Sequence, residues 1–263
     1  MSDFEEYRNR FKTIAMERRD GILELTFHSR GESLQWSALP HREWAEAFRK
    51  VGDDPENKVI IMTGTGDTFS GPPGSRETSP IVSPAEWEHI RWTGYRLIMS
   101  LLDVEAPVIG VINGPAWRHA EVPLLADIVL ASDDAVIQDS GHFVNNIVPG
   151  DGMHIVMPLL LGPSRAKYFL LTGESLMSFE AKELGIVHEV LPREELLQRA
   201  RELAEQLARR PSVVLRYTRI LLTDQTRRLA REMLGYGLAL EGLGVVTEWV
   251  SQQQGAAPGG NAD

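Results

Sequence analysis

One segment of the chain, residues 139–152, combines a histidine and two aspartates with glycines: Asp-Ser-Gly-His-Phe-Val-Asn-Asn-Ile-Val-Pro-Gly-Asp-Gly. It follows a β-like run and precedes an apolar helical pattern, a position in which loops commonly hold active sites. If the fold brings His142 and Asp151 together, the carboxylate would fix the tautomer of the imidazole and stabilise its protonated form. In the plainer interpretation, Asp151 forms a turn between two glycines and His142 lies on the surface. Spacing alone favours that plainer interpretation.

A second candidate segment, residues 113–123, reads Asn-Gly-Pro-Ala-Trp-Arg-His-Ala-Glu-Val-Pro. It leaves a predicted buried strand, so its side chains are expected at the carboxyl edge of the sheet, where ligands of α/β proteins usually bind. Taken alone, His119 is more typical of a hydrogen-bonded structural histidine. Trp36 could place an indole N–H in a pocket, although most tryptophans are core residues. His41 and Glu241 lie in helical patterns, where such side chains usually face solvent.

Several kinds of chemistry are excluded or disfavoured by composition. The chain has no cysteine, which excludes disulfides, a thiol nucleophile, thiolate zinc sites and iron–sulfur clusters, and favours a reducing compartment. No dinucleotide-binding glycine motif, P-loop, nucleophile elbow or His-Glu-x-x-His motif occurs. The seven histidines show no metal-ligand spacing, so neither a metal nor an organic cofactor is expected.

Charge and hydropathy limit the partners. The net charge is −10, from 27 basic and 37 acidic side chains, which argues against binding to nucleic acid or to an anionic membrane. No apolar run approaches the roughly 18 residues of a membrane span. Residues 1–12 are charged and carry no apolar signal core, so we expect a cytoplasmic protein. Residues 255–263 are predicted to form a disordered tail.

The elements that must position these residues alternate between strands and amphipathic helices. Predicted strands cover residues 13–17, 22–27, 58–63, 107–112, 127–132 and 186–191. Predicted helices cover residues 41–51, a stretch beginning after the N-cap Ser83, and residues 164–171, 178–184, 193–210, 211–222 and 225–249. This pattern divides the chain into an α/β core, residues 1–190, and a helical region, residues 191–254. The latter has apolar faces and no remaining sheet to cover, so we expect an oligomer.

Residues 107–115 and 126–132 read Pro-Val-Ile-Gly-Val-Ile-Asn-Gly-Pro and Ala-Asp-Ile-Val-Leu-Ala-Ser. Together with residues 168–173 and 181–187, they resemble the enoyl-CoA hydratase (crotonase) superfamily. The resemblance extends from about residue 13 to the last helix. It implies an α/β fold built as a spiral of ββα units, with a helical C-terminal trimerisation region that forms a homotrimer or a hexamer of two trimers.

The chain departs from acyl-CoA members of that superfamily at both segments that usually hold the thioester oxyanion. Residues 116–120 contain no glycine after the Asn-Gly turn, and residues 70–74 contain Pro72 and Pro73, which have no N–H to donate. The usual pair of hydratase glutamates is not found at the expected places, although Glu121 lies near one of them.

These departures coincide with a similarity to the β-diketone hydrolase branch, typified by 6-oxocamphor hydrolase, in residues 33–36, 113–123 and above all 141–154. The functional residues of that branch carry over onto Trp36, His41, His119, His142, Asp151 and Glu241. The resemblance implies a cofactor-independent retro-Claisen hydrolysis of a cyclic 1,3-diketone to a keto acid.

In the implied roles, His142, oriented by Asp151, activates water, while Trp36 and His119 hydrogen-bond the carbonyls. His41 and Glu241 either orient the pocket or relay the proton to the enolate. An apolar ligand is suggested by the residues Trp87, Trp92, Phe143 and Val144.

Two alternatives stay open at this point. The first is an enoyl-CoA hydratase or isomerase that acts on an acyl-CoA thioester. The second is a non-catalytic scaffold of the same fold, which would have no need to keep a His–Asp pair together with His119 and Trp36.

Overall fold

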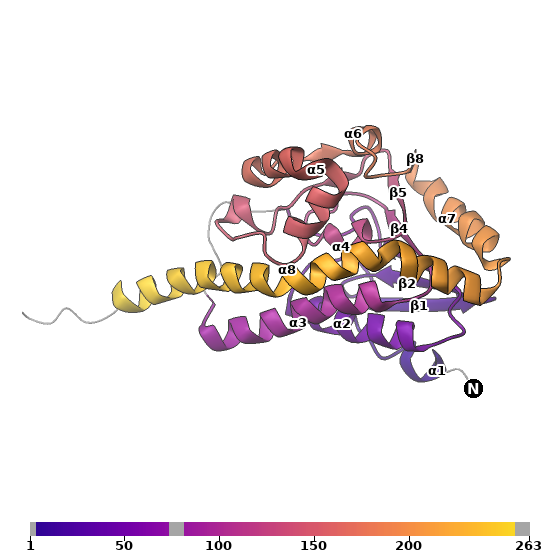
Figure 1. Cartoon of the computed structure of the whole chain (residues 1–263), viewed down its shortest axis with the longest axis horizontal. Coiled ribbons are helices and arrows are strands. Elements are labelled where there is room, and N and C mark those ends of the chain that lie inside the picture. The colour runs from indigo at the N-terminus through magenta and orange to yellow at the C-terminus, as the bar shows by residue number, and fades with distance from the viewer. Residues whose placement is uncertain (1–3, 74–81, 256–263) are drawn as a thin grey trace, which may run out of the picture.

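The computed structural model of the chain describes residues 4–73 and 82–255, and its body is one mixed sheet covered by helices (Figure 1). The six strands lie in the order β1 (Ile14–Arg19), β2 (Ile22–Phe27), β3 (Val59–Gly64), β4 (Val108–Ile112), β5 (Ile128–Ser132) and β8 (Glu189–Leu191). β1 and β2 are antiparallel, and the remaining neighbours are parallel. The predicted opening hairpin is confirmed, because Asp20 and Gly21 adopt the positive φ angles of a tight primed turn.

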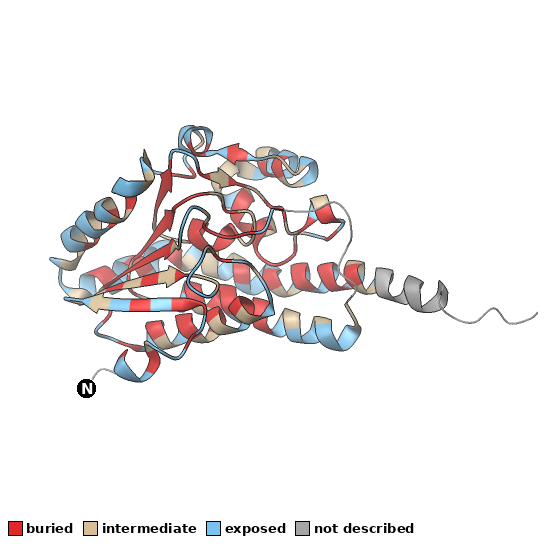
Figure 2. Cartoon of the chain, turned by 180° about the vertical axis from the view of Figure 1, so that it is seen from behind, coloured by how far each residue is buried: buried red, intermediate tan, exposed pale blue. Residues whose placement is uncertain are grey.

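Both faces of the sheet are covered, as parallel strands require. On one face lie α2 (Ala38–Asp53) and α3 (Pro84–Asp103), which pack on alternate residues of β2 such as Leu23 and Leu25. On the other face lies α7 (Arg193–Ala208), whose Leu196, Ala200 and Ala204 contact the opposite side of β3 and β4. Figure 2 shows the central strands largely buried between these helices.

The position of α7 corrects one expectation. The C-terminal helices were expected to have no sheet left to cover, yet α7 covers a complete face of it. That face consists of the apolar side chains of β3, β4 and β5 that α2 and α3 leave uncovered, including Ile61, Val111 and Leu130.

A second, much smaller set of strand contacts runs beside the main sheet. Single parallel bridges join Gln35 to Gly71, Ser70 to Ala116, and Ala116 to Ile137. These residues follow β2, β3, β4 and β5 in turn, so each successive strand is followed by a short second strand. This repetition is the predicted spiral of ββα units.

The remaining elements are short, apart from two helices. They are α1 (Phe4–Tyr7), α4 (Glu121–Leu124), β6 (Val136–Ile137), η1 (Phe143–Asn145), α5 (Met153–Thr172), β7 (Leu176–Met177), α6 (Ser178–Glu183) and α8 (Ser212–Gly255). The predicted start of α3 is confirmed by a capping box, in which Ser83 Oγ accepts a bond from Glu86 N–H and Glu86 Oε2 accepts one from Ser83 N–H.

The C-terminal region differs from its prediction in one respect. Two helices were expected, at residues 211–222 and 225–249, but the structure has the single helix α8. The intervening Thr223 and Asp224 do not break a helix, and Thr223 Oγ1 donates to the carbonyl of Arg219 within it. α8 lies against α3 and α5. Residues 256–263 of the predicted tail lie outside the described part of the chain.

Several apolar side chains on α5 and α8 are exposed in the single chain. They are Leu159, Tyr168, Leu171, Val213, Val214, Tyr217, Leu221, Leu222, Met233, Tyr236, Leu240 and Leu243. Oligomerisation through these helices stays a prediction. Among the described residues, no helix has the length and apolar character needed to cross a membrane.

A buried arginine anchors α8 to the body. Arg219 is 2% exposed; its Nε donates to Asp127 Oδ2 at 2.7 Å and its Nη1 to the carbonyl of Val104. The same Asp127 oxygen accepts the N–H of Val108 at the start of β4. One carboxylate therefore joins α8 to the sheet.

Replacing Asp127 by alanine leaves the Arg219 charge buried and unpaired. We expect the change to lower the free energy of unfolding by about 3 kcal/mol, measured by chemical denaturation. Asp224→Ala is the matched control, because the Asp224–Arg228 pair on the same helix is exposed and should contribute under about 1 kcal/mol. Equal losses in the two variants would contradict this role of Asp127.

Candidate active site

A cavity of about 400 Å³ brings together residues that are far apart in the sequence. All six residues singled out from the sequence line it: Trp36, His41, His119, His142, Asp151 and Glu241. They come from the segment after β2, from α2, from the turn before α4, from the two ends of the segment 142–151, and from α8. Its walls also include the apolar side chains of Trp87, Ile90, Ile147 and Val245.

His142 is held by carboxylates at both ring nitrogens. Its Nδ1 lies 2.5 Å from Asp139 Oδ1, and its Nε2 lies 3.2 Å from Asp151 Oδ2 and 3.7 Å from Glu241 Oε1. Sequence reasoning identified Asp151 as the orienting group and missed Asp139. The signal was present, because Asp139 precedes His142 by three residues in the same loop, close enough for its carboxylate to reach the ring.

The charges of His142 and Asp151 depend on two opposing effects, burial and the charges of neighbouring groups. Burial lowers the pKa of His142, but Asp139 and Asp151 outweigh it and raise that pKa well above its ordinary value. Burial raises the pKa of Asp151, but His142 and His119 outweigh it and bring that pKa below its ordinary range. Both shifts favour an imidazolium at His142 beside a carboxylate at Asp151.

His119 lies next to Asp151 on its other side. Its Nδ1 is 2.7 Å from Glu121 Oε1 and 3.2 Å from Asp151 Oδ2, and its ring stacks on Trp36 with 3.8 Å between centroids. The backbone of His119 has φ 51°, which turns the chain into α4 and places Glu121 beneath the ring. Burial lowers the pKa of His119 to about 4, so this imidazole is neutral.

Hydrogen bonds assign the tautomer of His41. Thr93 Oγ1 lies 3.0 Å from the carbonyls of both His89 and Ile90, to which it donates its single proton. With its proton used in this way, Oγ1 is suited to accept a bond from His41 Nδ1–H at 2.6 Å, the tautomer in which His41 Nε2 is unprotonated. Burial lowers the pKa of His41 to about 3, so the ring is a neutral hydrogen-bond acceptor.

Glu241 reaches the cavity because the loop before α5 packs directly on α8. A Cβ at Gly237 would lie 2.5 Å from the carbonyl oxygen of Gly150, so only glycine permits this approach of the two backbones. The contact brings Asp151, the next residue, close to Glu241, one turn further along α8. Burial and the charge of Asp151 raise the pKa of Glu241 well above its ordinary range, despite the opposing effect of His142.

The expected apolar lining is correct in part. Trp87 lines the cavity, whereas Trp92 and Phe143 are exposed and Val144 packs against Gly173. The side of α3 that faces the cavity carries residues at helical spacing, Trp87, Ile90 and Thr93, and Trp92 lies outside that stripe.

Two sets of three ligand-type side chains have their oxygen and nitrogen atoms within 4.8 Å of one another. The first is His119, Glu121 and Asp151, and the second is His142, Asp151 and Glu241. Hydrogen bonds between imidazoles and carboxyl groups account for the short contacts in both sets, so we assign no ion to them.

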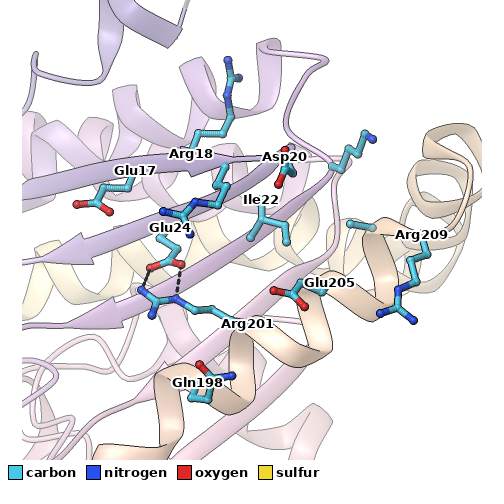
Figure 3. A pocket seen from close by; sticks show the side chains of 12 residues that line it. Glu17, Arg18, Asp20, Ile22, Glu24, Gln198, Arg201, Glu205 and Arg209 are labelled. Carbon is cyan, nitrogen blue, oxygen red and sulfur yellow. Dashed lines mark hydrogen bonds and ion pairs between the residues drawn. The ribbon is translucent and has the colours of Figure 1, made fainter.

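A larger groove of about 700 Å³ lies between the β1–β2 hairpin and α7 (Figure 3). Its lining is mostly charged, and Arg201 forms a two-bond ion pair with Glu24 across it. The described residues that line this groove include no histidine. The cluster of histidines and buried acids lies in the smaller cavity.

Asp139→Asn tests how His142 is held. Removing the carboxylate charge at Nδ1 should lower the pKa of His142, because burial is then opposed by Asp151 alone. The measurement is an NMR titration of the His142 ring, with the exposed Asp133→Asn as the matched control in the preceding turn. An unchanged His142 titration in Asp139→Asn would show that Asp139 does not set the charge of the ring.

Known proteins share this fold at several levels of similarity. A solved beta-diketone hydrolase from the cyanobacterium Anabaena sp. PCC 7120, bound to (S)-3-oxocyclohexyl acetic acid, is 43% identical, with a TM-score of 0.88 over 92% of this chain and 98% of that chain. A solved enoyl-CoA hydratase/isomerase from Mycobacterium paratuberculosis is 25% identical, with a TM-score of 0.78 over 91% and 96% of the two chains.

Sequence comparison gives a related result. A carnitinyl-CoA dehydratase from Citrobacter koseri is 31% identical over 197 residues, which cover 74% of each chain. Residues 17–236 match the family described as enoyl-CoA hydratase/isomerase. Because this match spans most of the chain and the fold agrees with it, the chain belongs to the enoyl-CoA hydratase/isomerase family, the crotonase superfamily.

Proposed function

We propose that this chain hydrolyses a carbon–carbon bond of a cyclic 1,3-diketone and releases a keto acid. The observation that carries the proposal is the cavity itself, in which the His142–Asp151 pair lies beside the stacked rings of His119 and Trp36. One side can activate water, and the other can hydrogen-bond a carbonyl oxygen. The apolar walls suit a hydrocarbon ring.

The reaction is a retro-Claisen hydrolysis. Water adds through its oxygen to one carbonyl carbon while a base takes one of its protons, and the carbonyl oxygen becomes an oxyanion. The oxyanion then re-forms the C=O bond, and the bond to the carbon between the two carbonyls breaks. Its electron pair becomes the enolate of the second ketone, which takes up a proton on carbon. Because the substrate is cyclic, the product is one molecule that carries both the new carboxylic acid and the remaining ketone, with no change in oxidation state overall.

The base is His142 in its deprotonated form. Asp139 holds Nδ1, so Nε2 is the nitrogen that can accept the proton of water, next to Asp151. Since a protonated ring cannot accept another proton, the activity should rise with pH through the raised pKa of His142. Glu241, which burial keeps neutral, is suited to deliver a proton to the enolate carbon.

Trp36 and His119 stabilise the developing oxyanion in place of a backbone oxyanion hole. The indole N–H and an imidazole N–H are neutral donors in a largely water-excluded cavity, where such bonds are strong. They replace the backbone donors that Pro72 and Pro73 lack.

The alternative is a reaction on an acyl-CoA thioester. It is favoured by the carnitinyl-CoA dehydratases, which match at 30–31% identity. Arg118 is the one arginine or lysine side chain among the described residues that line the cavity, which gives little counter-charge for the several phosphates of CoA. The cyanobacterial beta-diketone hydrolase, at 43% identity, supports the diketone reaction, since it was solved with a keto acid bound.

The two reactions are separated by a substrate panel. Joining the acid carbon of (S)-3-oxocyclohexyl acetic acid to the ring carbon that is α to the ketone and opposite the side chain defines a bicyclic 1,3-diketone. We expect the purified chain to convert this diketone and its cyclic analogues to keto acids, and to turn over neither crotonyl-CoA nor carnitinyl-CoA. The reverse result would replace the proposal with the acyl-CoA reaction. If the chain turned over neither the diketones nor the acyl-CoA thioesters, the result would indicate the non-catalytic scaffold.

Replacing the base tests the mechanism. His142→Ala and Asp151→Asn should each lower kcat/KM for the diketone by roughly 10²–10⁴-fold, the contribution typical of general-base catalysis. His28→Ala is a matched control, because His28 lies outside the cavity and should leave kcat/KM unchanged. Near-normal turnover in both site variants would refute the assignment of the base.

A further inference from the structure

One fully buried acid in the site has no role in the mechanism above. Glu121 is 0% exposed; its Oε1 lies 2.7 Å from His119 Nδ1, and its Oε2 has no hydrogen-bond partner among the described residues. A carboxyl group in such a position is costly unless it interacts specifically with its neighbour. Among the described residues, its side-chain hydrogen-bond partner is the His119 ring, which faces the cavity beside Trp36.

The position of the His119 proton decides what this ring can do. Its Nδ1 faces two carboxyl groups, Glu121 at 2.7 Å and Asp151 at 3.2 Å, whereas its Nε2 forms no hydrogen bond within the described part of the chain. A neutral imidazole carries one proton. If the proton is on Nδ1, then Nε2 is an acceptor and cannot stabilise an oxyanion. If it is on Nε2, the ring is a donor to the cavity, but Nδ1 needs a donor of its own.

Only one neighbour can supply that donor. Asp151 is ionised, and its Oδ2 also faces His142 Nε2, from which it accepts a hydrogen bond at 3.2 Å. Glu121 is different, because burial, with the charge of Asp151 adding to it, raises its pKa well above the ordinary range and favours its protonated, neutral form. A neutral acid has an O–H to donate.

The two tautomers of His119 then differ in how many buried donors and acceptors form a hydrogen bond. With the proton on Nδ1, the Glu121 O–H either opposes the N–H across the 2.7 Å contact or sits on Oε2, where no acceptor lies within reach. With the proton on Nε2, the Glu121 O–H donates to the Nδ1 lone pair, and the 2.7 Å separation fits an O–H···N bond. The second arrangement leaves no buried donor unpaired.

We propose that Glu121 is a positioning residue that donates its carboxylic O–H to His119 Nδ1 and thereby keeps the imidazole proton on Nε2. The assignment rests on the complete burial of Glu121, on its 2.7 Å contact with His119 Nδ1 and on the negative charge of Asp151 nearby. Its catalytic consequence rests on the proposed function: the Nε2–H is then permanently aimed at the substrate carbonyl, and no proton has to move before the oxyanion forms.

The direct test is the tautomer of His119 in the free protein. In protein labelled with ¹⁵N-histidine, NMR distinguishes a protonated from an unprotonated ring nitrogen, and the His119→Gln variant identifies the signals by their loss. We expect Nε2–H in the native chain. A His119 with its proton on Nδ1 in the native chain would overturn the proposal without any variant, and without any knowledge of the substrate.

Two substitutions separate donation from packing. Glu121→Gln keeps an N–H donor of the same shape and should keep the Nε2–H tautomer and kcat within about tenfold of the native value. Glu121→Met fills the space without a donor, so the proton should move to Nδ1, where Asp151 accepts it, and kcat should fall roughly 10²-fold with a smaller change in KM. The exposed Glu232→Met on α8 is the matched control and should change neither measurement.

The outcomes remain distinguishable from failure of the proposed function. If the substrate panel shows no diketone cleavage but His119 changes tautomer in Glu121→Met, the proton arrangement stands and only its catalytic consequence fails. If Glu121→Met keeps the Nε2–H tautomer, or if Glu121→Gln loses it, Glu121 does not donate to this ring and the proposal is wrong.

Discussion

The site depends on one buried, ionised carboxylate, Asp151, that lies between two imidazoles. Asp151 Oδ2 lies 3.2 Å from both His119 Nδ1 and His142 Nε2. Burying a charge is costly unless it is paired, so the position of each ring and the charge of each acid around it must accommodate this one negative group. Asp151 raises the pKa of His142 and also adds to the burial that keeps Glu121 and Glu241 neutral.

Burial and neighbouring charges therefore give side chains of the same type different protonation states. Among the histidines singled out from the sequence, the raised pKa of His142 favours its charged form, whereas His41 and His119 are neutral with pKa values of about 3 and 4. Asp151 is an acceptor, whereas Glu121 and Glu241 are acids that still carry a proton. One cavity thus offers a potential base, neutral hydrogen-bond donors and a proton source, which are the groups that a hydrolysis through an enolate needs.

The family also includes carnitinyl-CoA dehydratases, so the proposal that this chain cleaves a diketone rests on a few residues of the site. The fold supplies the sheet edge and the contact of the loop before α5 with α8, where Gly150 and Gly237 meet. Side chains then determine the chemistry, and in this chain imidazole and indole rings line the cavity. Fold alone does not determine function, so the proposed function rests on the groups that line the cavity.

The sequence by itself determined the strands, the capped start of α3, the spiral repeat and six of the residues that meet in the cavity. Each follows from local periodicity, local capping chemistry or a residue pattern shared with a family. Only the tertiary structure decided that α8 is one helix, that Asp139 holds His142, and that Glu121 lies beneath His119. It also decided which groups are charged, because a pKa in this cluster depends on burial and on charges from distant segments. Those effects arise only when the chain folds and removes the groups from water.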